Sequence, residues 1–219
     1  MSEFSLIERL IHKVKIKIIE PLFAPFRRKK LTNTDFTIIS NNCWGGRVYE
    51  YFGLRKNSPT IGAYFFPTDF IAFVRDLKYY TSKPIQMISA EESKWYEQLK
   101  FKGQRKFPIG RIDEIEVVFL HYQDPTIAKE KWERRCKRIN WNNIIYKFSY
   151  MNGCTDKDVR EFDNLTKGKK RVIFTRKKIE YVSECIIIPP AFKNDDVTQI
   201  TNDTFYFDRY VDLVKMING

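Results

Sequence analysis

The residues best suited to chemistry are a cysteine and a histidine that lie far apart in the chain. Cys43 sits in the loop Ser40–Gly46, and His121 follows an apolar run that reads as a strand. A thiol becomes a nucleophile when a base takes its proton, and histidine is the commonest general base near neutral pH. Asn42 and His121 are the side chains that could assist Cys43. The competing interpretations are an inert buried cysteine at 43 and a hydrogen-bonded structural histidine at 121.

The loop around Cys43 also has the composition of a ligand-binding loop. Its asparagines offer amide donors and acceptors, its glycines allow close approach of the backbone, and its tryptophan offers a stacking face. Glycines before a helix can also present N–H groups to a phosphate, although neither common nucleotide-binding glycine pattern is present. The alternative is a tight turn capped by the asparagines. The candidate substrate-binding residues are Ser40, Asn41, Asn42, Trp44, Gly45 and Gly46.

A second candidate site is a row of basic residues on a helix that should begin near Pro125. The spacing i, i+3, i+4, i+7 places four basic side chains on one face, beside an apolar stripe. Guanidinium groups bind phosphate in bidentate fashion, so this row predicts a phosphate or pyrophosphate site. A solvated face, or one paired with acids, is the alternative. The four residues are Lys131, Arg134, Arg135 and Arg138.

No metal site is expected. Asp156-Lys-Asp158 has the letters that many glycosyltransferases use to hold a metal, but its place after Thr155 at a helix start is explained by capping. The cysteines show neither a CxxC pair nor zinc-ligand spacing, which predicts reduced thiols. They are Cys43, Cys136, Cys154 and Cys185.

Predicted strands and helices alternate along the chain, and they must position the candidate site residues. Short β-rich runs separated by helical patterns predict an α/β fold, with a mostly parallel sheet and helices on both faces. Ligands bind at the carboxyl ends of strands in such sheets, at a point where strand order reverses. The run 114–122 is apolar on both faces and should be a central strand. Strands are predicted at 36–39, 60–65, 85–89, 114–122, 143–148, 171–174 and 184–188, and helices at 48–52, 68–80, from 89, 125–138, after 155 and 208–217.

The chain divides into a basic tail and one domain. Residues 1–34 predict an amphipathic helix with a linker, and residues 35–219 a single α/β domain. The helix should end at Pro21 and Pro25. A basic amphipathic helix can lie on an anionic membrane, which makes residues 1–30 a candidate membrane contact; packing on the domain or on another chain is the alternative. The apolar stripe comprises Phe4, Ile7, Ile11, Val14 and Ile18.

Composition excludes several classes of protein. The formal net charge is +12, but much of the excess lies in the tail and one helix, and no nucleic-acid-binding module is recognisable, so nucleic acid is not an expected partner. No apolar run is long enough to span a bilayer, and the N-terminus lacks the pattern of a secretory signal. The expected location is the cytoplasm, with peripheral attachment to the inner face of the plasma membrane.

Several segments together resemble the DUF1919 family, bacterial proteins of unknown biochemistry that are often labelled exopolysaccharide biosynthesis proteins. The most distinctive segment is Phe36-Thr-Ile-Ile-Ser-Asn-Asn-Cys-Trp-Gly-Gly46, and the similarity extends over about residues 35–215. The resemblance implies an α/β domain in a capsular or exopolysaccharide pathway and supplies no catalytic residues. The other segments that carry it are 51–54, 57–60, 108–110, 119–122, 131–135, 138–141, 202–204 and 209–214.

Two functional hypotheses follow. The first is a glycosyl- or acyltransferase acting on a sugar or polysaccharide precursor, with His121 as base and the basic row holding a phosphate-containing donor such as a nucleotide sugar or an acyl-CoA. The second is a non-catalytic accessory protein at the membrane surface that binds polysaccharide intermediates or a pathway enzyme. The sequence leaves both hypotheses and the oligomeric state open, and it identifies no certain cofactor.

Overall fold

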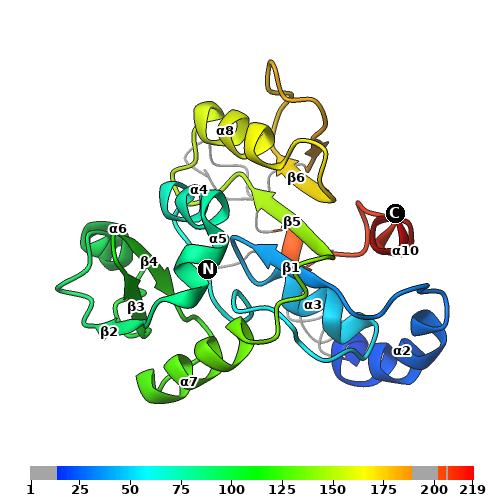
Figure 1. Ribbon diagram of the computed structural model, residues 1–219, viewed down its shortest axis with the longest axis horizontal. Coiled ribbons are helices and arrows are strands. Elements are labelled where there is room, and N and C mark those ends of the chain that lie inside the picture. Colours follow the sequence, from blue (N-terminus) through cyan, green and yellow to red (C-terminus); the bar gives the residue numbers. More distant parts are fainter. Residues whose placement is uncertain (1–13, 189–201, 206) are drawn as a thin grey trace.

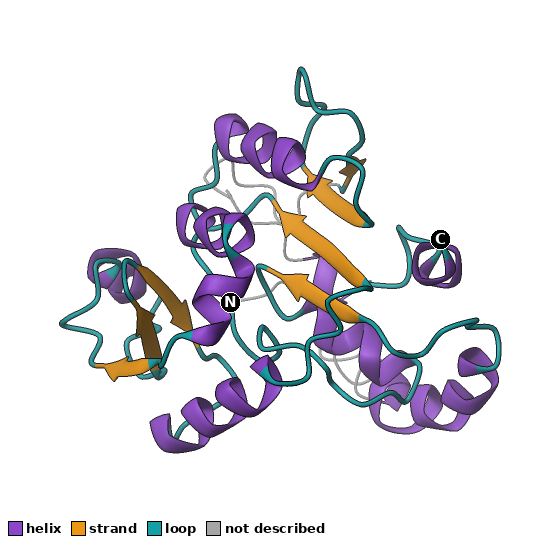
Figure 2. Ribbon diagram, viewed as in Figure 1, coloured by secondary structure: helices purple, strands orange, loops and turns teal. Residues whose placement is uncertain are grey.

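The computed structural model describes residues 14–188, 202–205 and 207–219. It contains two sheets (Figures 1 and 2), which confirms the predicted α/β class and a mostly parallel main sheet. The main sheet has the order β1 (Thr37–Ser40), β5 (Ile144–Ser149), β6 (Arg171–Thr175), β7 (Ile186–Ile187), and all neighbouring strands are parallel. The smaller sheet is antiparallel, with the order β2 (Gln86–Ile88), β3 (Ile109–Ile112), β4 (Ile115–Val118).

Helices cover both faces of the main sheet, as the sequence predicted. One face carries α4 (Pro67–Arg75) and α8 (Asp156–Thr166), and the other carries α3 (Trp44–Tyr51) and α10 (Leu213–Asn218). Because both faces are covered, parallel strands such as β5 are buried along their length. The remaining helices are η1 (Lys15–Ile19, a π-helical turn), α2 (Glu20–Arg28), α5 (Leu77–Ser82), α6 (Tyr96–Phe101), α7 (Pro125–Cys136) and α9 (Asn202–Phe205).

The run 114–122 is not a central strand of the main sheet, contrary to the prediction. Only β4 within it is a strand, and it lies in the smaller sheet. It is apolar on both faces because Val117 packs into the core under α4, whereas Val118 packs into a second cluster with Tyr64. The predicted strand 60–65 is a turn that pairs with β4 only through the bridge between Tyr64 and Val118.

Other element boundaries also differ from the prediction. The helix expected at 68–80 breaks at Asp76, whose carboxylate caps α5 by accepting from Tyr79 N. The segment from Ser89 is a turn, and its helix begins only at Tyr96. The last helix begins at Leu213 rather than at residue 208, because the carboxylate of Asp212 caps it. Strand β3 was not predicted.

The prolines near the N-terminus do not end a helix, contrary to the prediction. Pro21 occupies the first turn of α2, which follows η1 without a break, and α2 continues past Pro25 to Arg28. Most of the predicted apolar stripe, including Phe4, Ile7 and Ile11, lies outside the described residues. Within the described residues, every helix is too short or too polar to cross a bilayer.

Candidate functional site

The structure brings Cys43 and His121 together. Cys43 is the N-cap residue of α3, directly after β1, and His121 follows β4 of the other sheet. The Cys43 Sγ lies 3.2 Å from the His121 Nε2, within hydrogen-bonding distance for sulfur. His121 is held in place through its backbone N–H, which donates to the Gly62 carbonyl at 3.2 Å. The pair therefore spans the junction of the two sheets.

The site lies at the carboxyl end of β1, but not at a reversal of strand order. The main sheet runs β1, β5, β6, β7 without such a reversal, and β1 lies at one of its edges. The predicted location at strand ends therefore applies to Cys43, whereas His121 reaches the site from outside the main sheet.

Electrostatics keep both members of the pair neutral at rest. Burial raises the pKa of the Cys43 thiol to about 12, and the positive charge of Lys147 only partly opposes it. Burial also lowers the pKa of His121 below its usual value, with Glu50 acting in the opposite direction. At neutral pH the pair is therefore a thiol and a neutral imidazole. This imidazole can accept the thiol proton as a bond to sulfur forms.

A buried polar network fixes the backbone on both sides of Cys43. The Lys147 ammonium is fully buried and donates to Asp203 Oδ2 at 2.5 Å, to Ser149 Oγ at 2.5 Å and to Asn42 Oδ1 at 2.7 Å. The same Asn42 oxygen accepts from Trp44 N at 3.1 Å. The residues before and after Cys43 are therefore tied to one buried cation.

Several loop residues predicted to bind substrate are engaged in the fold. The side chain of Asn41 bonds both the N–H and the carbonyl of Ser149, at 2.9 Å each, and so joins the ends of β1 and β5. Trp44 is fully buried and packs edge-on against Phe174, so it has no free stacking face. A Cβ on Gly45 would lie 2.9 Å from the Ile38 side chain, so this glycine allows α3 to pack on β1. The side chain of Ser40 is also buried, and its hydroxyl contacts the amide of Asn42.

A basic hollow of about 430 Å³ opens on one side of the Cys43–His121 pair. Gly46 lines it, together with four cationic side chains and one acid, Glu50. Glu50 is engaged by Lys56 at 2.7 Å and by Arg47 at 2.5 Å. The hollow therefore keeps an excess of positive charge. Its cationic residues are Arg47, Lys56, Lys131 and Arg135.

The predicted arginine row lies only partly in this hollow. Lys131 lines it, with its ammonium over the Tyr122 ring. Arg135 is buried, and one nitrogen donates to the Ile61 carbonyl at 2.9 Å and to the Tyr122 hydroxyl at 2.7 Å, so its role includes holding the loop beside His121. Arg134 and Arg138 do not line the hollow. Desolvation lowers the pKa of Arg138, and so do the charges of Arg55, Arg134 and Arg135. Several positive charges therefore lie close to Arg138.

A second, more neutral hollow of about 300 Å³ opens on the other side of the pair. Asn152 lines it with a buried amide whose Nδ2 has no hydrogen-bond partner among the described residues. Lys102 bonds the oxygen of the same amide, and burial lowers the pKa of Lys102 to about 8. Tyr64, Gln104 and Thr204 add hydroxyl and amide groups to the wall. This hollow can bind an uncharged or acidic group that is rich in oxygen.

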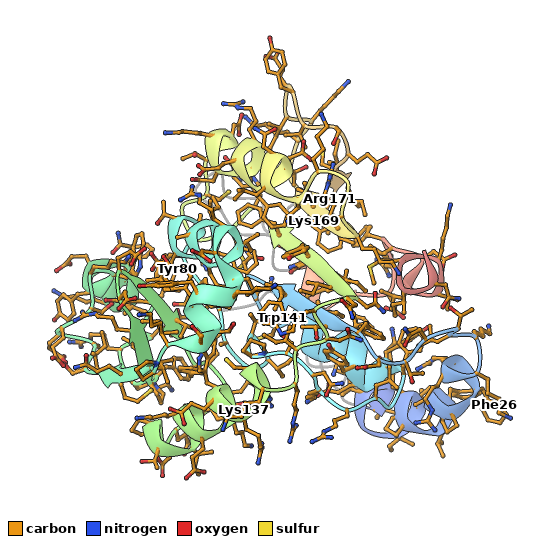
Figure 3. The ribbon with its side chains drawn as sticks, viewed as in Figure 1. Phe26, Tyr80, Lys137, Trp141, Lys169 and Arg171 are labelled. Atoms are coloured by element: carbon orange, nitrogen blue, oxygen red, sulfur yellow. The ribbon has the colours of Figure 1, made fainter. Side chains whose placement is uncertain are left out.

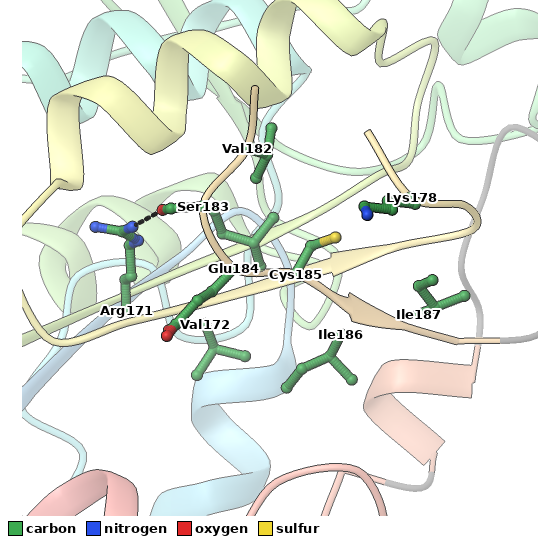
Figure 4. Close-up of a pocket in the computed structure, with 10 residues that line it drawn as sticks. Arg171, Val172, Lys178, Val182, Ser183, Glu184, Cys185, Ile186 and Ile187 are labelled. Atoms are coloured by element: carbon green, nitrogen blue, oxygen red, sulfur yellow. Dashed lines mark hydrogen bonds between the residues drawn. The ribbon is translucent and has the colours of Figure 1, made fainter. Parts of the chain in front are cut away.

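Another hollow, at the β6–β7 end of the main sheet, has no cysteine–histidine pair in its lining (Figure 4). It has a volume of about 470 Å³ and contains Cys185, but no histidine lines it. Its arginine, Arg171, is already bonded to Asp163 at 2.8 Å and to Ser183 at 2.5 Å. A thiol, an imidazole and an excess of positive charge therefore lie together at Cys43.

The capping interpretation of the segment Asp156-Lys-Asp158 is confirmed. The Thr155 hydroxyl accepts from Asp158 N, and the Asp158 carboxylate accepts from Thr155 N at 2.7 Å, which forms a capping box. Asp156 pairs with Lys177 at 2.8 Å. In the described parts of the chain, no cluster of three or more histidine, cysteine or acidic side chains could hold a metal ion.

The sequence reasoning missed Lys147 and Asp203. One signal was present, because Lys147 is a charged residue within the predicted strand 143–148, which is otherwise largely apolar. A buried lysine needs a partner, so its presence there indicates a buried acid elsewhere in the chain. No local pattern could identify that acid as Asp203, which is 56 positions away.

The neutral state of the pair has a measurable consequence. The rate of Cys43 alkylation by iodoacetamide should rise continuously from pH 6 to pH 10, because the thiolate is the reactive species and the thiol pKa is about 12. Peptide mass spectrometry after timed quenching would give this rate for Cys43 separately from the other cysteines. A constant rate between pH 5 and pH 8 would instead reveal a preformed thiolate–imidazolium pair.

Comparisons with known proteins give a family but no activity. The profile of a family described as "Domain of unknown function (DUF1919)" matches residues 14–218. An uncharacterized protein of Haemophilus influenzae (strain ATCC 51907 / DSM 11121 / KW20 / Rd) is 30% identical over 196 residues, which cover 87% of this chain and 88% of that protein. The range that the family profile matches includes both Cys43 and His121.

Proposed function

The chain belongs to the DUF1919 family, and we propose that it is a cysteine-dependent acyltransferase that modifies a sugar precursor in exopolysaccharide or capsular polysaccharide biosynthesis. The observation that carries the proposal is the 3.2 Å approach of Cys43 Sγ to His121 Nε2 between two hollows of different character. Cysteine and histidine at this distance are the parts of a nucleophile and its base. The polysaccharide context comes from the family resemblance.

Acyl transfer suits this pair better than glycosyl transfer. Glycosyl transfer through a covalent intermediate needs a free carboxylate as its nucleophile, as in the glycosidases. The acids lining the two hollows are both engaged, Glu50 by Lys56 and Arg47, and Asp203 by Lys147. Formation of a thioester on Cys43 requires a thiol and a base, and Cys43 and His121 supply them.

The proposed reaction has two steps. Cys43 Sγ attacks the acyl carbonyl, His121 Nε2 takes the thiol proton, and the bond from the acyl carbon to the donor's leaving group breaks as that group receives the proton. An acceptor hydroxyl then attacks the thioester, His121 takes the hydroxyl proton, and the carbon–sulfur bond breaks to restore the thiol. The N-terminus of α3, with its positive dipole end at Cys43, favours the negative charge that develops in each step.

The two hollows suggest how donor and acceptor are arranged. The basic hollow suits a phosphate-containing donor, such as an acyl-CoA, because Lys56, Lys131 and Arg135 line it with positive charge. The neutral hollow suits a hydroxylated acceptor, because Asn152 offers a free amide donor there. A sugar presents hydroxyl groups that such amides recognise.

The proposal predicts a covalent intermediate whose formation depends on Lys131 of α7. Incubation with acetyl-CoA or acetyl phosphate should add one acetyl group at Cys43, seen by intact-protein and peptide mass spectrometry. Replacing Lys131 with methionine should slow acetylation by these donors by about tenfold or more, since the variant loses a charge-assisted contact between this lysine and the donor phosphate.

Controls separate donor binding from general charge loss. Lys157→Met with Lys167→Met removes two positive charges from the α8 region and should leave acetylation unchanged. The loss caused by the α7 variant should be larger for acetyl-CoA than for p-nitrophenyl acetate, which contains no phosphate. Equal losses for both reagents would remove the phosphate role, and the absence of any acyl adduct on Cys43 with either reagent would remove the acyltransferase proposal.

A further inference from the structure

The exposed side of η1 and α2 carries large apolar side chains on successive turns. Each of them is between 42% and 65% exposed, which is unusual for a group of such residues on one helix face. We call this face the α2 stripe. It consists of Ile18, Ile19, Leu22, Phe23 and Phe26.

The orientation of the stripe is fixed by the opposite side of the helix. Ala24 is buried against the domain, and Glu20 is buried and paired with Arg47 of α3 at 3.1 Å. The guanidinium of Arg27 stacks over the Tyr51 ring at 3.8 Å. Figure 3 shows Phe26 at the outer edge of the molecule, on the α2 side. The helix is therefore docked on the domain by one face, and the stripe faces outward.

The charges that the end of α2 and the residues after it place beside the stripe are all positive. The segment Arg27-Arg-Lys-Lys30 ends α2 and follows it. The Lys29 ammonium lies 5.9 Å from the centre of the Phe26 ring, so positive charge borders the apolar face directly. The sole acid in residues 14–30 is Glu20, which is buried on the far side.

We propose that the α2 stripe docks this protein on the surface of an anionic lipid bilayer, with the helix lying in the plane of the interface. An apolar face bordered by lysine and arginine matches the boundary between acyl chains and anionic headgroups. A second copy of the chain fits less well, because a symmetric contact would bring two basic borders together in a protein of net charge +12.

Vesicle co-sedimentation of the full chain tests the proposal. The protein should pellet with phosphatidylcholine vesicles rich in phosphatidylglycerol and remain in solution with vesicles of phosphatidylcholine alone. The triple variant Leu22→Ser, Phe23→Ser, Phe26→Ser should lower the partition coefficient on anionic vesicles by about tenfold or more, because each side chain loses apolar burial. Lys29→Gln with Lys30→Gln should also lower it by about tenfold.

Matched controls carry similar changes elsewhere. Phe101→Ser removes a phenylalanine that is 92% exposed on α6, and Lys157→Gln with Lys167→Gln removes two cations from the α8 region. Both should bind anionic vesicles like the parent, and circular dichroism should show every variant folded. Unchanged binding of the triple variant would overturn the proposal. So would a dimer in sedimentation equilibrium that the triple variant converts to a monomer, because the stripe would then be a subunit interface.

Discussion

Replacing His121 with alanine should slow the acylation of Cys43 by about 10²–10⁴-fold, the usual contribution of a positioned general base. The effect should be large because burial raises the pKa of the Cys43 thiol to about 12, so very little thiolate exists at neutral pH without a base. The 3.2 Å approach of Nε2 to Sγ provides the base that removes the thiol proton during attack.

A simple activated ester measures this effect without knowledge of the natural donor. Acylation by p-nitrophenyl acetate releases nitrophenolate in a burst equal to the amount of protein, and mass spectrometry places the acetyl group. Cys43→Ala should abolish the burst. His121→Asn keeps a polar side chain without a base of suitable pKa and should be as slow as His121→Ala.

Cys136 supplies the matched control. It is a partly buried thiol whose pKa burial also raises to about 12, but no histidine contacts it among the described residues. Cys136→Ala should therefore leave the burst unchanged. If His121→Ala reacted within twofold of the parent protein, or if Cys43→Ala kept its burst, the nucleophile–base assignment would be wrong.

The sequence identified both members of this pair but could not show that they meet. The position of Cys43 after a strand and before a helix was readable from local pattern, because β1 and α3 each have a clear apolar face. The position of His121 was inferred from a strand assigned to the wrong sheet. It depends instead on the pairing of Tyr64 with Val118, a contact between segments 54 positions apart that no local pattern specifies.

The basic row on α7 also shows that sequence pattern predicts local placement but not tertiary contacts. Helical spacing correctly placed Lys131 and Arg135 near each other on α7. It could not show that Arg135 would be buried, because that burial comes from the Ile61 carbonyl and the Tyr122 hydroxyl of neighbouring loops. Periodicity identifies the residues that share a face, whereas the tertiary partners of that face decide which ones remain free for a ligand.

Replacing Asp203 with alanine should destabilise the protein by about 3–5 kcal/mol, because it leaves the fully buried Lys147 ammonium without its counter-charge. For a chain of this length, that loss should lower the Tm by about 6–20 °C. Thermal unfolding followed by circular dichroism at pH 7 measures it. Glu133→Ala breaks the exposed pair with Lys129 on α7 and should cost less than about 1 kcal/mol.

The acid dependence of stability should change in the same variant. Burial alone would raise the pKa of Asp203, but the Lys147 ammonium and the hydrogen bonds from Ser149 and Asn42 outweigh burial and lower it. A carboxyl whose folded pKa lies below its unfolded value contributes stability above the unfolded pKa, about 3.9, and loses it as the pH falls through the folded pKa. The parent protein should therefore lose more stability below about pH 4 than Asp203→Ala does.

A double variant separates the cost of an unpaired charge from the value of the pair itself. Lys147→Met with Asp203→Leu removes both charges and should recover much of the stability that Asp203→Ala loses, since apolar replacement of a whole buried pair is often close to neutral. The same variant deprives the Asn42 oxygen of the Lys147 ammonium, so the backbone beside Cys43 loses a tether. Stability should then return, whereas the nitrophenolate burst should be slower than in the parent protein. A double variant that regained both stability and burst rate would show that the buried pair does not position Cys43. A double variant as unstable as Asp203→Ala would show that the ion pair and its hydrogen bonds stabilise the fold more than apolar side chains do in their place.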